Sequence, residues 1–171
     1  MTQSFESILC TRCGLCCGGS LFADVELSSA EAARLEFAGL EIEDDSLLLQ
    51  PCAALHGRKC SIYSHRPKCC RTFECLLLQQ TKRGEISIAA ATQKIDATLA
   101  LVKRIHALLA TLAPTDPHLP LKERCLEALE SAPPTDTSTE LESAMASLDQ
   151  TINEVFLQNA NTPCLRAKAR S

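Results

Sequence analysis

Four cysteines stand within eight residues of this chain, in the segment CTRCGLCC. In all, nine of the eleven cysteines lie in the first 75 of 171 residues. A hydrophobic core does not require thiols at such close intervals, whereas a metal ion or cluster needs several thiolates in one place. The nine are Cys10, Cys13, Cys16, Cys17, Cys52, Cys60, Cys69, Cys70 and Cys75. The chemistry of the chain is therefore expected in its N-terminal half.

Disulfides are the main alternative to metal ligation, and the cellular compartment is the first criterion that separates them. The N-terminal segment MTQSFESILC has neither the basic start nor the apolar run of a signal peptide, so we expect a cytoplasmic protein. Neighbouring thiols such as Cys16 and Cys17 also lie too close to pair easily without strain. We therefore expect metal ligation and not disulfides.

The net charge of −4 gives no reason to expect binding to nucleic acid or to an anionic membrane. The most apolar long stretch, residues 95–112, is interrupted by Lys103, Arg104 and His106, which argues against a transmembrane span. Residues 61–85 carry five basic side chains against two acidic ones. This basic segment is either a solvated strip or a set of cations that offsets an anionic thiolate centre.

The N-terminal half is expected to be irregular. Ser28 followed by Glu31 predicts a capping box and a short helix with Ala32, Leu35 and Phe37 facing inward. The segments LLLQPC and KCSIY read as two strands of a small hairpin that brings Cys52 and Cys60 close. A turn at Pro67 is then expected to lead into one or two helical turns that stop at Gly84.

The C-terminal half is expected to form about three helices. Apolar residues recur at helical spacing along residues 88–112, which predicts a central helix with a wide buried face. Prolines break this helix and the shorter one that follows. Thr137 with Glu140 is expected to cap a third helix, whose narrow apolar seam packs back on the central helix. The sequence thus predicts a mainly α fold, with a cysteine-rich metal-binding module over residues 1–85 and a helical region over residues 86–171 that ends in a frayed basic tail.

Nine thiols exceed the four ligands of one tetrahedral metal site. The adjacent Cys16 and Cys17 cannot easily close on one ion, because consecutive side chains point in different directions. This favours two sites or one polynuclear cluster. Were CTRCGLCC a continuous helix, Cys10, Cys13 and Cys17 would share one side, whereas its glycines would allow a turn around a cluster instead.

The segments CTRCGLCC, PC, KCSIY and RPKCCRTFEC resemble the CxxCxxCC zinc- or iron-chelating family, the YkgJ-like cysteine-cluster proteins, over roughly residues 8–85. In that family a CxxCxxCC start is followed by a lone cysteine, CxIY, RP and CRxFxC. The resemblance implies zinc or iron, and eight ligands: Cys10, Cys13, Cys16, Cys17, Cys52, Cys60, Cys70 and Cys75. Cys69 is an addition to the pattern, and Cys125 and Cys164 fall outside the matched region.

The resemblance also suggests what surrounds the ligands. Tyr63, Arg66, Pro67, Arg71 and Phe73 match supporting positions of the pattern. We expect at least one of the two arginines to face the thiolates or to fix the loop through a backbone carbonyl. A related cysteine pattern occurs in flagellin lysine-N-methylase, which implies an iron–sulfur role in some relatives.

Other chemistries have weaker support. A cysteine nucleophile with His56 or His65 as its base is conceivable, but the crowd of thiols singles out none of them. Both histidines are expected at the surface. The usual hydrolase and nucleotide-binding motifs are missing, and so is the CxxxCP completion of a bacterial ferredoxin.

Two functions therefore remain. In the first, the protein is a binding or interaction module that holds zinc or iron, and its helical half carries any protein partner. In the second, it is an iron–sulfur protein with a redox or protein-modifying role. The sequence does not decide whether the chain is an enzyme.

Overall fold

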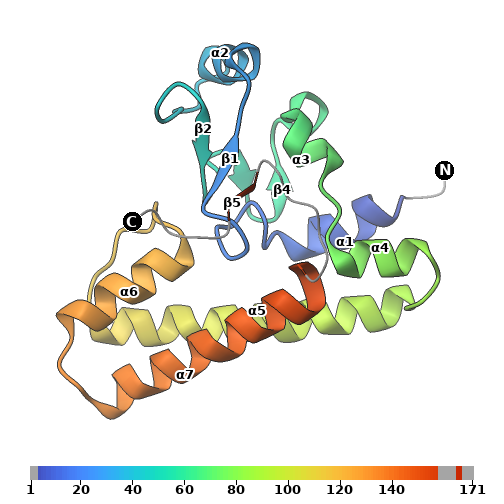
Figure 1. The fold of residues 1–171 in the computed structure, drawn as a ribbon. Coiled ribbons are helices and arrows are strands. Elements are labelled where there is room, and N and C mark those ends of the chain that lie inside the picture. Colours follow the sequence, from blue (N-terminus) through green and yellow to red (C-terminus); the bar gives the residue numbers. More distant parts are fainter. Residues whose placement is uncertain (1–3, 158–164, 167–171) are drawn as a thin grey trace. The chain divides into compact units, whose positions relative to one another are not determined.

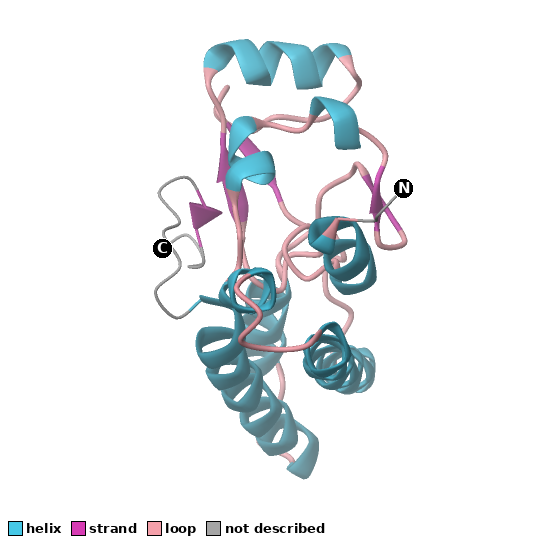
Figure 2. Ribbon diagram, turned by 90° about the vertical axis from the view of Figure 1, so that its right-hand side faces the viewer, coloured by secondary structure: helices cyan, strands magenta, loops and turns pink. Residues whose placement is uncertain are grey.

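A computed structural model describes residues 4–157 and 165–166, and its contacts divide the chain into two compact units. The first unit takes its described residues from 4–13, 74–117 and 121–157, and the second from 14–73, 118–120 and 165–166. The first unit is helical, whereas the second combines short strands, short helices and loops (Figures 1 and 2). The predicted fold class, a mainly α protein with an irregular cysteine-rich N-terminal half, is therefore confirmed.

The first unit consists of helices. They are α1 (Phe5–Cys13), α4 (Leu76–Lys82), α5 (Ile88–Leu112), α6 (Leu121–Ser131), α7 (Asp136–Thr151) and the π-helix η2 (Ile152–Leu157).

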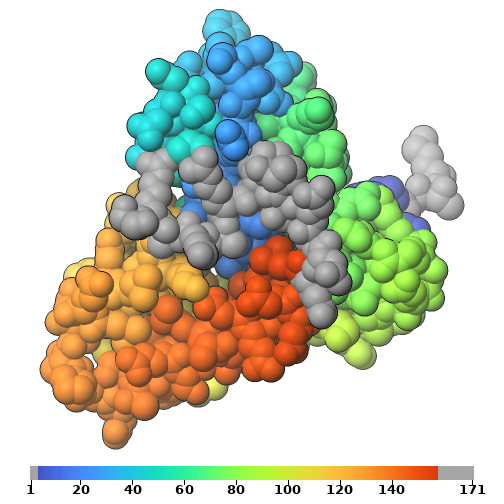
Figure 3. All heavy atoms as spheres, viewed as in Figure 1, coloured from blue at the N-terminus to red at the C-terminus, as the bar shows by residue number. Residues whose placement is uncertain are grey.

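The core of the first unit forms where α5 packs against α7, as the narrow seam of α7 predicts. Ile95, Ile105 and Leu109 of α5 and Leu141 of α7 are all buried. Helices α6 and α7 also lie side by side, as the space-filling view shows (Figure 3). Burial of this apolar surface is the main favourable term in the stability of the unit.

The predicted start of α7 is wrong by two residues. Thr135 is the N-cap, and its side chain accepts a hydrogen bond from the amide of Ser138 at 3.2 Å. Thr137, which the sequence favoured, lies inside the helix. The segment TDTST offers several capping residues, so local pattern alone does not select one of them.

The second unit contains two small antiparallel sheets and three short helices. Its elements are β1 (Asp24–Glu26), α2 (Ser29–Phe37), β2 (Leu47–Leu49), β3 (Leu55–His56), β4 (Lys59–Cys60), the 3-10 helix η1 (Tyr63–His65), α3 (Lys68–Thr72) and β5 (Leu165–Arg166). One sheet has the strand order β2-β1-β5, and the other is the β3-β4 hairpin. Of the tail that was expected to fray, only Leu165–Arg166 is among the described residues.

The predicted hairpin forms, but with different strands. Leu47–Leu49 pairs with β1, in the register Val25 to Leu48, and not with the strand that holds Cys60. The hairpin is instead made inside the predicted turn, where Leu55 pairs with Cys60 across Gly57. The apolar run LLL finds a better partner in β1, because pairing there buries Leu47 and Leu48.

Helix α2 begins as predicted and ends differently. Ser28 and Glu31 form the expected capping box, and Ala32 and Leu35 are buried. Phe37 is 97% exposed, so the expectation that it faces inward is wrong. The helix ends at this residue, and the next buried side chain is Leu40.

The segment after Pro67 forms two short helices, where the sequence predicted one or two helical turns that stop at Gly84. Helix α3 ends at Thr72, α4 begins at Leu76, and Gly84 follows α4 with φ +75°. Among the described residues, no helix is both long enough and apolar enough to cross a membrane. The division into a module over residues 1–85 and a helical region over residues 86–171 stays a prediction.

Gly19 allows two distant segments of the second unit to touch. Its φ is +72°, and a Cβ at this position would lie 3.1 Å from the backbone nitrogen of Pro51 and 3.2 Å from the carbonyl carbon of Gln50. Any side chain here would be strained by its backbone conformation and would press on backbone atoms. Gly19 therefore brings the first cysteine segment against the residues that precede Cys52.

We predict that Gly19→Ala lowers the free energy of unfolding by about 2 kcal/mol, because it combines positive φ with crowding. Gly39→Ala is the matched control, since Gly39 has φ +84° and nothing within 4 Å of the added Cβ. That control should cost only about 1 kcal/mol, the price of the backbone conformation. Denaturant unfolding of both variants measures the difference, and equal losses would contradict the close approach at Gly19.

Candidate metal centre

The backbone of the second unit brings Cys17, Cys52 and Cys60 together. The amide of Cys52 donates a hydrogen bond to the carbonyl of Cys17 at 2.8 Å. The amide of Leu55 donates to the carbonyl of Cys52 at 2.9 Å, and Leu55 pairs with Cys60 in the hairpin. Three cysteines, of which the first and last are 43 residues apart in sequence, are thus tied by consecutive backbone contacts.

Cys70 joins these three through its side chain. Burial raises the pKa of Cys70 to about 12, and the neighbouring Cys17, Cys52 and Cys60 add to this rise. The pKa of Cys17 rises to about 11, first through burial and then through Cys52 and Cys60. Each thiolate would repel the others, so the four thiols lie within electrostatic range of one another.

Cys52 is a buried thiol of this group. Burial raises the pKa of Cys52, the amide of Ala54 partly opposes this rise, and Cys60 adds to it. Thiols of this kind stay protonated at neutral pH, and only a metal ion or another cation can stabilise their thiolates. The four thiols therefore form a group of suitable donors for a thiophilic metal.

Arg66 provides a positive charge at this group. It lowers the pKa of both Cys17 and Cys70, against the larger effect of burial. Its Nε donates to the carbonyl of Tyr63 at 3.2 Å, and its guanidinium lies 3.8 Å from the centre of the Tyr63 ring. The prediction that one of the two arginines faces the thiolates or fixes the loop is thus confirmed for Arg66, whereas Arg71 is exposed.

Helix α3 supplies two adjacent cysteines with different environments. Cys70 is a partly buried thiol, whereas Cys69 is buried and disulfide-bonded. The expectation that metal ligation excludes disulfides is therefore wrong for Cys69. Consecutive residues of a helix project about 100° apart, which lets the two sulfurs serve different purposes. Phe73 follows the helix and packs edge-to-face on Phe22, with ring centroids 5.1 Å apart.

Three further predicted ligands, Cys10, Cys13 and Cys75, belong to the first unit. Cys10 and Cys13 lie three residues apart near the end of α1, a spacing that places them on neighbouring positions of the helix surface. Cys75 is the N-cap of α4, where its side chain makes no capping hydrogen bond, although the nearby amides of Leu78 and Leu77 act to lower its pKa. Burial nevertheless raises the pKa of Cys75.

The packing of α1 against α4 places Cys13 and Cys75 at the same end of this helix pair. The two helices pack together and run in opposite directions (Figure 1). Lys82 in the last turn of α4 forms an ion pair with Glu6 in the first turn of α1. Cys13 and Cys75 each lie seven residues from that ion pair, so at about 1.5 Å per residue they come to the same end of the helix pair.

The motif CTRCGLCC is therefore not one continuous helix. Helix α1 ends at Cys13, and Gly14 follows with φ +69°. Cys16 and Cys17 lie in the turn beyond it, which is closed by a hydrogen bond from the amide of Gly18 to the carbonyl of Gly14 at 2.8 Å. Of the two conformations that the sequence left open, the structure contains the glycine turn.

The remaining candidates lie apart from these groups. His56 and His65 are exposed, as expected. Cys125 is completely buried in α6, and Cys164 lies outside the described residues. Within the described part of the chain, no three His, Cys, Asp or Glu side chains are already arranged closely enough to hold a metal ion. The donor chemistry of the four thiols of the second unit fits such an ion, and closing on it requires them to lose their protons and move together.

A family model matches residues 9–97, and its description is "CxxCxxCC: Putative zinc- or iron-chelating domain". The chain belongs to this family. The match covers more than half of the sequence and includes all eight cysteines that the sequence motifs indicate as ligands. No curated protein and no solved structure matches the chain. Membership supports metal binding, with zinc or iron as the metal.

We predict that Arg66→Gln weakens metal binding by about tenfold, as is typical when a residue that supports metal ligands is replaced. Without the guanidinium, the pKa values of Cys17 and Cys70 rise further and their thiolates become harder to form. Arg71→Gln is the control, because it removes the same charge from an exposed position of α3. Competition with a chromophoric chelator measures both affinities, and equal effects would show that only the net charge matters.

Proposed function

We propose that this protein holds zinc or iron with its eight motif cysteines, and that Cys17, Cys52, Cys60 and Cys70 form one four-thiolate site. The backbone contacts that tie Cys17, Cys52 and Cys60 together carry the proposal, and the electrostatic influence of these three thiols on Cys70 supports it. Soft thiolate ligands select zinc and iron over magnesium or calcium. Four thiolates around one divalent ion leave a net negative charge, which Arg66 would partly offset.

The other four motif cysteines are divided between the two units. Cys10, Cys13 and Cys75 stand at one end of the α1–α4 pair, and Cys16 lies in the turn after α1. Eight thiolates exceed the needs of one tetrahedral ion, so we propose more than one metal ion per chain or a polynuclear centre.

In this proposal the metal stabilises the second unit, and the protein acts as a binding module. Its helical half would then present the surface for a protein partner. An iron–sulfur centre with a redox or protein-modifying role is the competing function, which has the same ligands. The two differ in metal content, labile sulfide and colour.

Metal analysis and a visible spectrum of anaerobically purified protein test the proposal. We expect at least one zinc or iron per chain. A colourless zinc protein supports the binding module, and a brown protein with iron and labile sulfide supports the competing function. Protein that takes up neither metal would refute both.

We predict that Cys70→Ser removes bound metal, because it leaves the four-thiolate site one ligand short. Cys69→Ser should keep the metal stoichiometry and instead lower stability by roughly 2–4 kcal/mol, through loss of a disulfide. Cys125→Ala is a further control, since Cys125 is a buried thiol of the helical unit. Metal content and thermal unfolding of the three variants give the answer. If Cys69→Ser lost the metal and Cys70→Ser retained it, the ligand assignment would be wrong by one residue.

We predict that chelation unfolds the second unit while the helices of the first unit persist. The second unit is built from strands of two or three residues and helices of at most nine, which bury little surface by themselves. Structural zinc contributes about 10–16 kcal/mol of apparent binding free energy in small domains. Hydrogen exchange should show loss of protection over residues 14–73 and retention along α5 and α7. Full protection of residues 14–73 in chelated protein would contradict a structural role for the metal.

A further inference from the structure

Helix α3, which carries Cys70, has no capping side chain of its own. Its N-cap residue is Pro67, whose side chain makes no capping hydrogen bond. The first amides of a helix have no partner within the helix and need an acceptor from elsewhere. A helix of five residues is also too short to be stable by itself.

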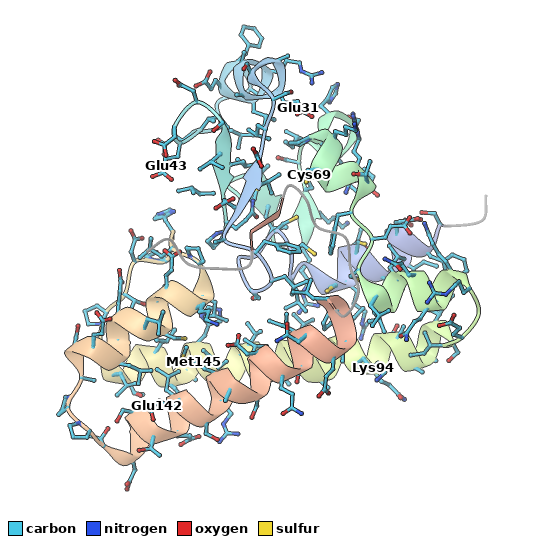
Figure 4. The ribbon with its side chains drawn as sticks, viewed as in Figure 1. Glu31, Glu43, Cys69, Lys94, Glu142 and Met145 are labelled. Carbon is cyan, nitrogen blue, oxygen red and sulfur yellow. The ribbon has the colours of Figure 1, made fainter. Side chains whose placement is uncertain are left out.

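Glu31 supplies the acceptor from another helix. Its Oε1 accepts a hydrogen bond from the amide of Lys68, the first residue of α3, at 2.7 Å. Glu31 lies on α2, 37 residues earlier in the chain. Figure 4 shows Glu31 and Cys69 in the same unit, on α2 and α3 respectively.

The other oxygen of the same carboxylate is used by α2. Oε2 accepts from the amide of Ser28 at 3.1 Å and from its hydroxyl at 2.8 Å, which completes the capping box. The pKa of Glu31 is lowered to about 2, chiefly by the amide of Lys68 and then by the hydroxyl of Ser28. One carboxylate thus caps two helices that are distant in sequence.

Only one of these two helices carries ligands. Cys70 follows Lys68 by two residues, within the first turns of α3, and its sulfur interacts with Cys17, Cys52 and Cys60. The position of Cys70 relative to those thiols depends on where α3 begins. A contact that fixes the amide of Lys68 therefore fixes the approach of Cys70.

We propose that Glu31 is a positioning residue for the metal centre, which sets Cys70 against the other thiols by capping α3 from α2. This inference rests on the proposed metal-binding function and goes beyond the ligand set. Glu31 is not a ligand in it. It acts through the backbone of Lys68, so its loss should change how firmly metal is retained more than how much metal is bound.

Four variants of the full-length metal-loaded protein separate this role from simple capping of α2. Glu31→Ala removes both caps, whereas Ser28→Ala weakens the α2 cap and leaves the contact with Lys68. Glu31→Gln keeps one oxygen that can accept from Lys68, but its amide nitrogen cannot accept from Ser28. Glu36→Ala removes a carboxylate of the same helix at an exposed position.

The measurement is the rate at which each protein transfers its metal to an excess of chromophoric chelator. We expect Glu31→Ala to lose metal about tenfold faster than wild type, which is the lower end of the effect of residues that support ligands. Ser28→Ala and Glu36→Ala should match wild type, although Ser28→Ala lowers the thermal midpoint. Glu31→Gln should fall between wild type and Glu31→Ala, and it remains informative if Glu31→Ala does not fold.

Equal acceleration by Ser28→Ala and Glu31→Ala would overturn the inference, because it would show that only the stability of α2 matters. Wild-type rates in Glu31→Ala and Glu31→Gln would overturn it as well.

Exchange protection of the Lys68 amide gives a second readout that does not depend on metal. This protection should fall in Glu31→Ala and persist in Ser28→Ala. If the wild-type protein binds no metal, the proposed function has failed, and the positioning role fails with it. Exchange protection of the Lys68 amide that falls in Glu31→Ala but not in Ser28→Ala would still show that Glu31 caps both helices.

Discussion

The hydrogen bond between the backbones of Cys17 and Cys52 is the contact on which the metal centre depends. It joins the turn after α1 to the segment before the β3-β4 hairpin, and thereby places two candidate ligands that are 35 residues apart in sequence. The approach is possible because Gly19 has no side chain to meet Gln50 and Pro51. The hairpin then adds Cys60, and α3 adds Cys70.

Burial of these thiols has opposite effects on the two states of the centre. It raises the pKa values of Cys17, Cys52 and Cys70, so these metal-free thiols remain neutral and do not repel one another. The same low-polarity surroundings strengthen the attraction between thiolates and a metal ion once the protons have left. Arg66 reduces the cost of deprotonation without filling a ligand position. The arrangement favours tight binding that releases protons, and disfavours exposed anionic thiolates.

Much of this structure could be predicted because its signals are local. The capping box of Ser28 and Glu31, the helix breaks at the prolines after α5 and at Gly84, and the cysteine spacing are each contained within a few residues. The prediction that at least one of Arg66 and Arg71 supports the thiolates rested on charge, since a cation lowers the energy of nearby thiolates, but it did not select between the two. The burial of Phe37 was predicted wrongly because helical spacing does not reveal where a helix ends relative to the core.

What could not be predicted depends on contacts between distant segments. The strand Leu47–Leu49 pairs with β1 because that pairing buries its leucines, and no local turn signal indicates this choice. The disulfide of Cys69 also has no signature in a sequence where the neighbouring thiol has every mark of a metal ligand. The second use of Glu31 is hidden for a related reason. The capping box already accounts for a glutamate at position 31, so the sequence gives no sign that its carboxylate has a second partner in α3.

Helix α3 shows why such distant contacts matter for the chemistry. A five-residue helix gains too little from its own hydrogen bonds to be ordered alone. Its position comes from the carboxylate of Glu31 at its start, the disulfide of Cys69 in its first turn, and the contact of Phe73 with Phe22 after its end. A ligand on a long, rigid helix would be insensitive to any one of these. In the proposed centre, Cys70 on α3 would depend on all three, so the affinity for metal would be set partly by residues that are not ligands.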